Sequence, residues 1–264
     1  SVLRHEQRVS YVFDSDFVVK TNKGIRMSLP GRDISITPFI ALGGGFEDRE
    51  TTFLSNVLSG GDFFVDVGSN VGVFSLVAAK KVGPFGRVFA FDPNPVVMEH
   101  LSRSLYLNYL HDRVQLLPYA VGDSSKHIKL HFSPFSLGNA SLAVDPNSST
   151  RKAIDLFGKM DTLEAEQIAL DAFFHYDPFI KCLKIDVEGF EHQVIKGAKR
   201  LIEKGMIKII LFELMLQVNF NEYKKNIEAI EYLMQWGYKP HMLNEKGEAI
   251  YVNKQKLTRN GNII

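Results

Sequence analysis

The sequence predicts an α/β fold in which helices flank a parallel sheet, and three observations support this prediction. From Phe63 onward, short apolar runs alternate with amphipathic segments of helical period, as in strand–helix–strand units. The first such unit joins its strand to its helix through a turn that contains Gly68 and Gly72. The chain has 264 residues, of which 45% are hydrophobic and 23% are charged, values typical of a globular protein.

The N-terminal part is expected to form an extension of the main domain. Residues 17–20 and 24–29 are extended runs on either side of a turn-rich stretch, which predicts a β-hairpin. Apolar residues at helical spacing then predict a helix over residues 48–58. We therefore divide the chain into a β extension, residues 1–47, and a main domain, residues 48–264.

The main domain contains the predicted sheet. Six strands are expected, at residues 63–67, 87–91, 114–117, 127–132, 182–185 and 207–212, with helices at 71–81, from Pro95 onward, at 190–202 and around 227–234. Residues 134–161 are rich in Ser, Asn, Gly and Pro, and we expect a long loop there. Residues 238–243 and 249–252 are expected to close the chain as a hairpin.

Charge and composition argue against several classes of partner. The formal net charge is +1, from 31 Lys and Arg against 30 Asp and Glu, so no strong field attracts nucleic acid. No apolar run approaches the roughly 20 residues of a membrane span, and nothing at the N-terminus resembles a signal peptide. The single cysteine excludes an intramolecular disulfide and offers no zinc motif. We expect a cytoplasmic protein with no metal, nucleic-acid or membrane partner.

The turn after the first sheet strand carries the most information about function. Its spacing is G-x-x-x-G, from Gly68 to Gly72, with Asn70 in place of the glycine that a nicotinamide dinucleotide site normally needs. Asp66 stands at the end of the strand before the turn. A carboxylate there disfavours a pyrophosphate and favours a cationic group such as an α-amino group.

Two further segments indicate the rest of the ligand. Asp92 follows the second strand, 24 residues after Gly68, where an acidic residue can accept both hydroxyls of a ribose. Gly122 and Asp123, after the third strand, are expected to face the edge of an adenine base. An amino-acid end, a ribose and a base together describe S-adenosylmethionine.

These residues also resemble the FkbM-like family of S-adenosylmethionine-dependent methyltransferases, from about Glu50 to Leu214. The motifs that carry the resemblance are Val-Asp-Val-Gly-Ser-Asn-Val-Gly at 65–72, Phe-Asp-Pro-Asn-Pro at 91–95, Ala-Val-Gly-Asp at 120–123, Gly-Asn-Ala-Ser-Leu at 138–142, Leu-Asp at 170–171 and Lys-Ile-Asp-Val-Glu-Gly at 184–189. The resemblance implies a class I methyltransferase (Rossmann-like) fold, a doubly wound sheet of seven strands, mostly parallel with one antiparallel strand near the C-terminus. It also implies methylation of a hydroxyl on a sugar or secondary metabolite.

The motifs and the resemblance together define a set of candidate site residues. The expected cofactor-binding residues are Glu50, Asp66, Gly68, Ser69, Asn70, Gly72, Phe74, Asp92, Pro93, Val121, Gly122 and Asp123. A hydroxyl acceptor must lose its proton, and Asp186, Glu188 and His192 follow the fourth buried strand, where a general base is useful. Asp186 is the first choice among them. We expect the acceptor pocket to come from residues 43–45, residues 134–161 and the strand end near Glu213.

Other interpretations remain open at this stage. Asp66 and Asp92 also suit local turn chemistry, and Asp186 and Glu188 also suit a strand-to-helix turn. A nicotinamide-dependent oxidoreductase is the alternative enzyme class, although the third glycine is missing. A non-catalytic binding or scaffold module with a methyltransferase fold is the other alternative, and it predicts cofactor binding at most.

Overall fold

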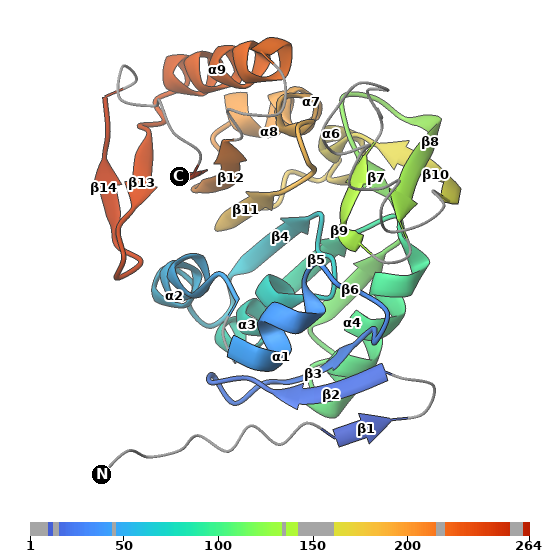
Figure 1. The fold of residues 1–264 in the computed structure, drawn as a ribbon. Coiled ribbons are helices and arrows are strands. Elements are labelled where there is room, and N and C mark those ends of the chain that lie inside the picture. The colour runs from blue at the N-terminus through green and yellow to red at the C-terminus, as the bar shows by residue number, and fades with distance from the viewer. Residues whose placement is uncertain are drawn as a thin grey trace.

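The computed structural model describes residues 10–12, 16–43, 46–133, 136–141, 161–214, 220–253 and 261–264. Within these ranges the centre of the molecule is an eight-stranded sheet with the order β14-β13-β15-β12-β11-β4-β5-β6 (Figure 1). The five strands β12, β11, β4, β5 and β6 run parallel, with bounds Ile210–Leu214, Cys182–Ile185, Phe63–Val67, Arg87–Phe91 and Val114–Leu117. The predicted parallel sheet is confirmed.

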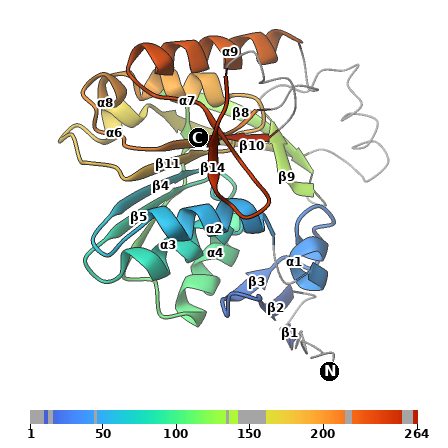
Figure 2. The ribbon, with the colours of Figure 1, turned by 90° about the vertical axis from the view of Figure 1, so that its left-hand side faces the viewer.

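Helices cover both faces of this sheet (Figure 2). One face carries α2, α3 and α4, with bounds Asp48–Val57, Val73–Val82 and Pro95–Leu107; the other carries α6, α7, α8 and α9, with bounds Leu170–Phe173, Glu191–Gly197, Lys199–Glu203 and Phe220–Gln235. Each face has its own cluster of buried apolar side chains. Because helices bury both faces of the sheet, the central strands are nearly continuous apolar runs in the sequence.

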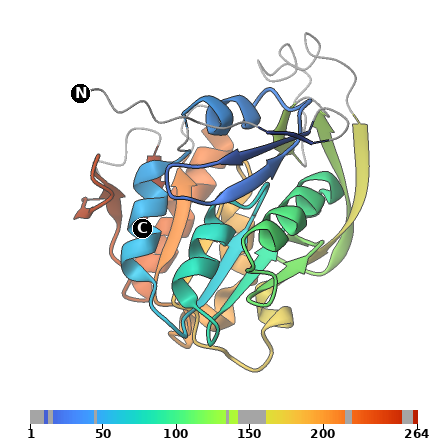
Figure 3. The ribbon, with the colours of Figure 1, turned by 90° about the horizontal axis from the view of Figure 1, so that it is seen from below.

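The N-terminal hairpin forms as expected, from β2 (Asp16–Lys20) and β3 (Arg26–Leu29). An additional strand, β1 (Ser10–Val12), pairs with β2, and helix α1 (Thr37–Gly43) follows the hairpin. The hairpin lies against α4 (Figure 3). The amide of Ser28 donates to Oγ of Ser104 at 2.9 Å, and both groups are buried. The boundary between extension and main domain after residue 47 stays a prediction.

The expected loop at residues 134–161 is wrong for residues 136–141. These form β9 (Ser136–Ser141), part of a second sheet with the order β7-β10-β8-β9, in which the other bounds are Ala120–Val121, Asp161–Ile168 and Lys126–Ser133. The sequence pattern missed β10 because its side chains are mostly polar and exposed. Backbone pairing with β8 along its length, from Asp161 opposite Phe132 to Gln167 opposite Lys126, holds it instead. Residues 142–160 lie outside the described residues.

The C-terminal part contains the expected hairpin and one strand that was not expected. The closing hairpin is confirmed as β13 (His241–Leu243) and β14 (Ala249–Tyr251). A further strand, β15 (Gly261–Ile263), lies between β13 and β12 and is antiparallel to both. Two strands of the described sheet, β15 and β14, therefore run opposite to the parallel strands rather than one, and β13 runs in the same direction as β12. No helix within the described ranges has the length and apolar character needed to cross a membrane.

The helix expected over residues 190–202 is divided into α7 and α8 at Ala198. Gly197 packs so closely on the neighbouring loop that a Cβ atom there would lie 1.9 Å from the carbonyl oxygen of Gly122. The carboxylate of Asp171, from α6, accepts hydrogen bonds from the amides of Arg200 at 2.7 Å and Leu201 at 3.1 Å. This side chain therefore supplies the cap at the start of α8.

We expect Asp171→Ala to lower the free energy of unfolding by about 2 kcal/mol, because two helix amides lose a charged acceptor. Thermal and urea denaturation measure this change. Asp161→Ala, which removes an exposed carboxylate, is the matched control and should leave stability within about 0.5 kcal/mol of the parent. Equal stabilities of the two variants would contradict the capping role.

Candidate active site

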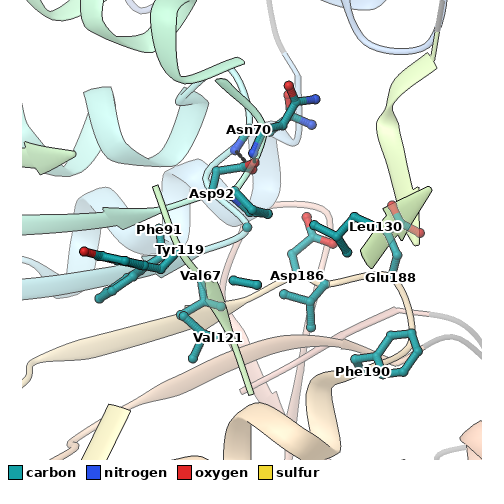
Figure 4. Close-up of a pocket in the computed structure, with 15 residues that line it drawn as sticks. Val67, Asn70, Phe91, Asp92, Tyr119, Val121, Leu130, Asp186, Glu188 and Phe190 are labelled. Carbon is teal, nitrogen blue, oxygen red and sulfur yellow. Dashed lines mark hydrogen bonds between the residues drawn. The ribbon is translucent and has the colours of Figure 1, made fainter. Parts of the chain in front are cut away.

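Two adjoining cavities lie at the carboxyl ends of the parallel strands; together with the open solvent at their mouths, they span about 760 and 920 Å³. The first, the Asp92 cavity, is lined by residues that include Asp92, Pro93, Tyr119, Val121, Leu130 and Phe190 (Figure 4). The second, the Lys184 cavity, is lined by residues that include Ile36, Phe39, Phe46, Glu47, Lys184 and Glu213. Gly68, Asn70, Asp186 and Glu188 border both cavities, so these four residues form the junction.

The glycine turn between β4 and α3 forms one side of the junction. Gly68 has a φ of 76°, and a Cβ atom there would lie 1.8 Å from the carbonyl oxygen of Asp186. Only glycine permits this close approach between the ends of β4 and β11. Asn70 is also left-handed, with a φ of 49°, and its side-chain oxygen accepts a hydrogen bond from the amide of Val71 at 2.7 Å.

Asp92 lies at the end of β5 and joins this turn to the start of α4. Its two carboxylate oxygens accept hydrogen bonds from the amides of Asn70 and Asn94, both at 2.9 Å. Burial raises the pKa of Asp92 to about 6, although these two hydrogen bonds act in the opposite direction. The side chain is only half-buried and lines the cavity, so its remaining lone pairs can accept hydrogen bonds from a diol.

The ammonium group of Lys184 contacts several groups beside the junction. It is 5% exposed, and its ammonium lies 3.3 Å from a carboxylate oxygen of Asp66 and 3.3 Å from one of Asp186. It also donates to the carbonyl oxygen of Gly68 at 2.8 Å and lies 5.0 Å from the ring centre of Phe74. Burial alone would lower its pKa, but Asp66 and Asp186 raise the pKa of Lys184 well above its usual value. Lys184 therefore carries a positive charge near neutral pH.

Asp66 lies outside the described lining of both cavities. It is fully buried, and Oγ of Ser75 donates to it at 2.7 Å while Lys184 pairs with its other oxygen. Burial raises its pKa, an effect that Lys184 and Ser75 oppose. The expected direct contact between Asp66 and an ammonium group stays a prediction; in this structure the carboxylate has Lys184 as its charged partner.

Three further carboxyl groups line the Lys184 cavity, on Glu47, Glu188 and Glu213. Burial, followed by repulsion from Asp186, raises the pKa of Glu47 to about 8, that of Glu188 to about 8 and that of Glu213 to about 7. The described lining contains more carboxyl groups than lysines, since Lys184 is its one lysine. The cavity therefore favours a cationic or neutral ligand over an anion.

Glu188 occupies a strained position within the junction. Its φ is 53°, a left-handed conformation that costs a residue with a side chain about 1 kcal/mol or more. Such conformations persist only where the surroundings enforce them, and they concentrate at functional sites. The strain therefore marks Glu188 as a functional candidate.

The structure brings most of the predicted site residues to the cavities. Pro93 and Val121 line the Asp92 cavity, and Ser69, Gly72 and Phe74 line the Lys184 cavity. Five predicted residues lie outside the described lining of both cavities: Glu50, Asp66, Gly122, Asp123 and His192.

The reasons differ among these residues. Glu50 is buried in α2, where Arg49 lies 3.4 Å from its carboxylate. Asp123 pairs instead with Ser124 and Lys126, and Gly122 packs against Gln167 and Gly197. His192 lies on α7 outside the lining. The contacts therefore do not support these assignments.

Sequence reasoning gave no role to Lys184, Glu47 or Tyr119, all of which line a cavity. A signal existed for Lys184, since it is a charged residue within the short buried strand Cys-Leu-Lys-Ile. Lysine is rarely fully buried without a partner, so a lysine at that position implies carboxylates nearby.

Comparison with known proteins agrees with this geometry. Residues 66–240 match the model of the methyltransferase FkbM domain. The chain belongs to the FkbM methyltransferase family. It is 33% identical over 155 residues to methyltransferase sdnD of Sordaria araneosa, covering 51% of this chain and 60% of that protein. It is 27% identical over 149 residues to hexuronic acid methyltransferase AglP of Haloferax volcanii, covering 56% of this chain and 55% of that protein.

The chain thus spans between half and two thirds of the length of these two relatives. Among solved structures, it is similar to methyltransferase FkbM from Methylobacillus flagellatus at 14% identity, with a TM-score of 0.47, covering 72% of this chain and 42% of that chain.

The cofactor that the FkbM family implies is S-adenosylmethionine, and the groups around the cavities fit it. Asp92 offers acceptors for the ribose hydroxyls, and Tyr119, Val121 and Leu130 offer an apolar wall for the base. The carboxylates at the junction suit a cationic amino-acid end. The first residues of α3, Val73 and Phe74, line the Lys184 cavity, where a helix N-terminus favours a carboxylate.

We expect Asp92→Asn to weaken binding of S-adenosylhomocysteine by about 10- to 100-fold, the effect of losing a charged hydrogen-bond acceptor. In the parent, affinity should fall as the pH decreases through about 6, because protonation of Asp92 removes the same acceptor. Calorimetry between pH 5 and pH 8 measures both effects.

Asp112→Asn is the control, since the Asp112 side chain is 57% exposed and lies outside both cavities. If the Asp92→Asn variant bound as the parent does at every pH, the ribose assignment would be excluded.

Proposed function

We propose that this chain transfers the methyl group of S-adenosylmethionine to a hydroxyl oxygen of a small-molecule acceptor. One observation carries the proposal: the Asp92 cavity and the Lys184 cavity meet at Gly68, Asn70, Asp186 and Glu188. A nucleoside in the first cavity and an acceptor in the second would meet beside two carboxylates. The family supports the reaction class.

The cofactor would lie across the junction. Its ribose would bind Asp92, and its base would contact Tyr119, Val121 and Leu130. Its ammonium group would face Asp186 and Glu47, which both line the Lys184 cavity. Glu47 thus takes the ammonium-binding role that the sequence suggested for Asp66.

The cofactor supplies an electrophilic methyl group on a positively charged sulfur. The acceptor oxygen forms a bond to the methyl carbon, while the electron pair of the carbon–sulfur bond remains on sulfur. The chain's main contribution is to align the acceptor oxygen with that bond. A second contribution is to take up the proton that the hydroxyl loses.

Glu188 is the better candidate for this proton. One carboxylate oxygen of Asp186 is held 3.3 Å from the ammonium of Lys184, so this oxygen already has a partner within the protein. Glu188 borders the same junction, and its pKa of about 8 suits a general base near neutral pH. This reverses the order of preference that the sequence suggested, and His192 drops out because it does not line either cavity in the described structure.

The acceptor is proposed to be an uncharged sugar or another polyol. The described lining of the Lys184 cavity combines an apolar wall, Ile36, Phe39 and Phe46, with carboxyl groups that accept hydrogen bonds. Its one basic side chain, Lys184, is already paired with Asp66 and Asp186. A relative named for hexuronic acid methylation supports a sugar acceptor, but the charge of this cavity favours a neutral sugar over a sugar acid.

The test combines cofactor binding with acceptor screening. Calorimetry should show binding of S-adenosylhomocysteine in the micromolar range, as is usual for enzyme ligands. Incubation with methyl-labelled S-adenosylmethionine and the matched pair methyl glucoside and methyl glucuronide should transfer more label to the neutral glycoside. Absence of cofactor binding by the folded chain would exclude the function, and preference for the glucuronide would exclude the neutral acceptor.

We expect Glu188→Gln to lower methyl transfer by about 100-fold or more, the usual contribution of a general base, with little change in binding of S-adenosylhomocysteine. In the parent, the rate should rise with pH and level off above about 8, because only the ionised carboxylate accepts a proton. Rates with methyl glucoside or a better acceptor measure this. Glu245→Gln, in an exposed turn, is the control; a fully active Glu188→Gln variant would contradict the assignment.

A further inference from the structure

We propose that Glu191, a residue outside both cavities, is a positioning residue that acts through Glu188. The inference rests on the proposed function, because it concerns the base of that reaction. Glu191 is the first residue of α7 and is fully buried, and it does not belong to the described lining of either cavity. Its effect on a ligand must therefore pass through other residues.

The hydrogen bonds of Glu191 enclose Glu188 on both sides. One of its carboxylate oxygens, Oε1, accepts from the amide of Val187 at 3.3 Å and from the amide of Gly189 at 3.1 Å. These amides belong to the residues directly before and after Glu188. A single acceptor thus holds both ends of the left-handed segment in which Glu188 has a φ of 53° and Gly189 a φ of 100°.

The other oxygen of Glu191 is held from a different helix. Nδ2 of Asn226, which is 1% exposed on α9, donates to Oε2 at 3.3 Å. Both carboxylate oxygens are therefore held by hydrogen bonds, which link the turn around Glu188 to helices α7 and α9. Surroundings of this kind are what a strained conformation requires in order to persist.

The two junction carboxylates consequently have separate supports. Lys184 holds Asp186 at the start of the turn, and Glu191 holds Glu188 further along it. Without Glu191, the segment is free to leave the left-handed region, and the side chain of Glu188 then moves away from the junction. Loss of Glu191 should therefore affect the group that faces the methyl position more than it affects the nucleoside site.

A pair of ligands separates these two effects. Sinefungin resembles S-adenosylmethionine but carries an amino group on carbon in place of the methylsulfonium, so it places an ammonium where the methyl group would lie. S-adenosylhomocysteine has no group there. The ratio of their dissociation constants reports on the carboxylate at the junction, whereas general damage to the site weakens both ligands.

We expect the parent to bind sinefungin about tenfold more tightly than S-adenosylhomocysteine, the size of one charge-assisted hydrogen bond. Glu188→Gln should reduce this ratio to near one, and Glu191→Leu should do the same while binding S-adenosylhomocysteine within about threefold of the parent. Glu191→Gln retains an oxygen acceptor of the same shape and should preserve most of the ratio. Calorimetry at pH 8.5, with melting temperatures as the folding control, measures all four proteins.

The ratio of the two dissociation constants in each variant decides whether Glu191 positions Glu188. A folded Glu191→Leu variant that keeps the parent ratio overturns the positioning role, and so does a Glu191→Gln variant that loses the ratio as fully as Glu191→Leu. If Glu191→Leu does not fold, Asn226→Leu replaces it; a reduced ratio supports the inference and an unchanged ratio overturns it. A parent that binds both ligands equally refutes the placement of Glu188, whereas a parent that binds neither refutes the proposed function itself.

Discussion

The pairing of Lys184 with Asp66 and Asp186 is the interaction on which the site depends. Lys184 and Asp66 are direct register partners on the parallel strands β11 and β4, so their side chains project to the same face. The ammonium also holds the carbonyl oxygen of Gly68, which joins the glycine turn to the same cation. A buried charge without its partner typically costs about 3–5 kcal/mol. The strand register, the turn and the orientation of Asp186 are therefore coupled through one side chain.

One cation cannot neutralise all the carboxyl groups that surround it. Lys184 forms ion pairs with Asp66 and Asp186. Burial and repulsion from nearby carboxylates raise the pKa values of the neighbouring groups Glu47, Glu188 and Glu213. S-adenosylmethionine carries a positive charge on sulfur, which reduces the repulsion among these carboxyl groups. S-adenosylhomocysteine has lost that charge and reduces the repulsion less. The same electrostatics that raises these pKa values thus favours the donor over the product.

Much of this arrangement was predictable from the sequence, and the exceptions share a physical cause. The buried strands and the turn at Gly68 follow from local apolar runs and glycine spacing, and the cavity-lining carboxylate Asp92 follows from its place after β5. Strand β10 was missed because pairing with β8, rather than an apolar face, holds it. The burial of Asp66 and the partners of Glu191 depend on residues distant in the sequence, at Lys184 and Asn226. A lysine within a buried strand implies carboxylates nearby, but no local pattern says which residues they are.

Asp186 and Glu188 illustrate how the fold gives different surroundings to similar groups. The two residues are separated by one position and have the same acidic chemistry, so the motif alone does not decide which accepts a proton. The left-handed turn brings both to one junction, but it leaves them with opposite neighbours, a lysine for Asp186 and other carboxylates for Glu188. The two carboxyl groups therefore differ in their neighbours rather than in their chemistry. The proposed division of roles depends on the packing behind the turn.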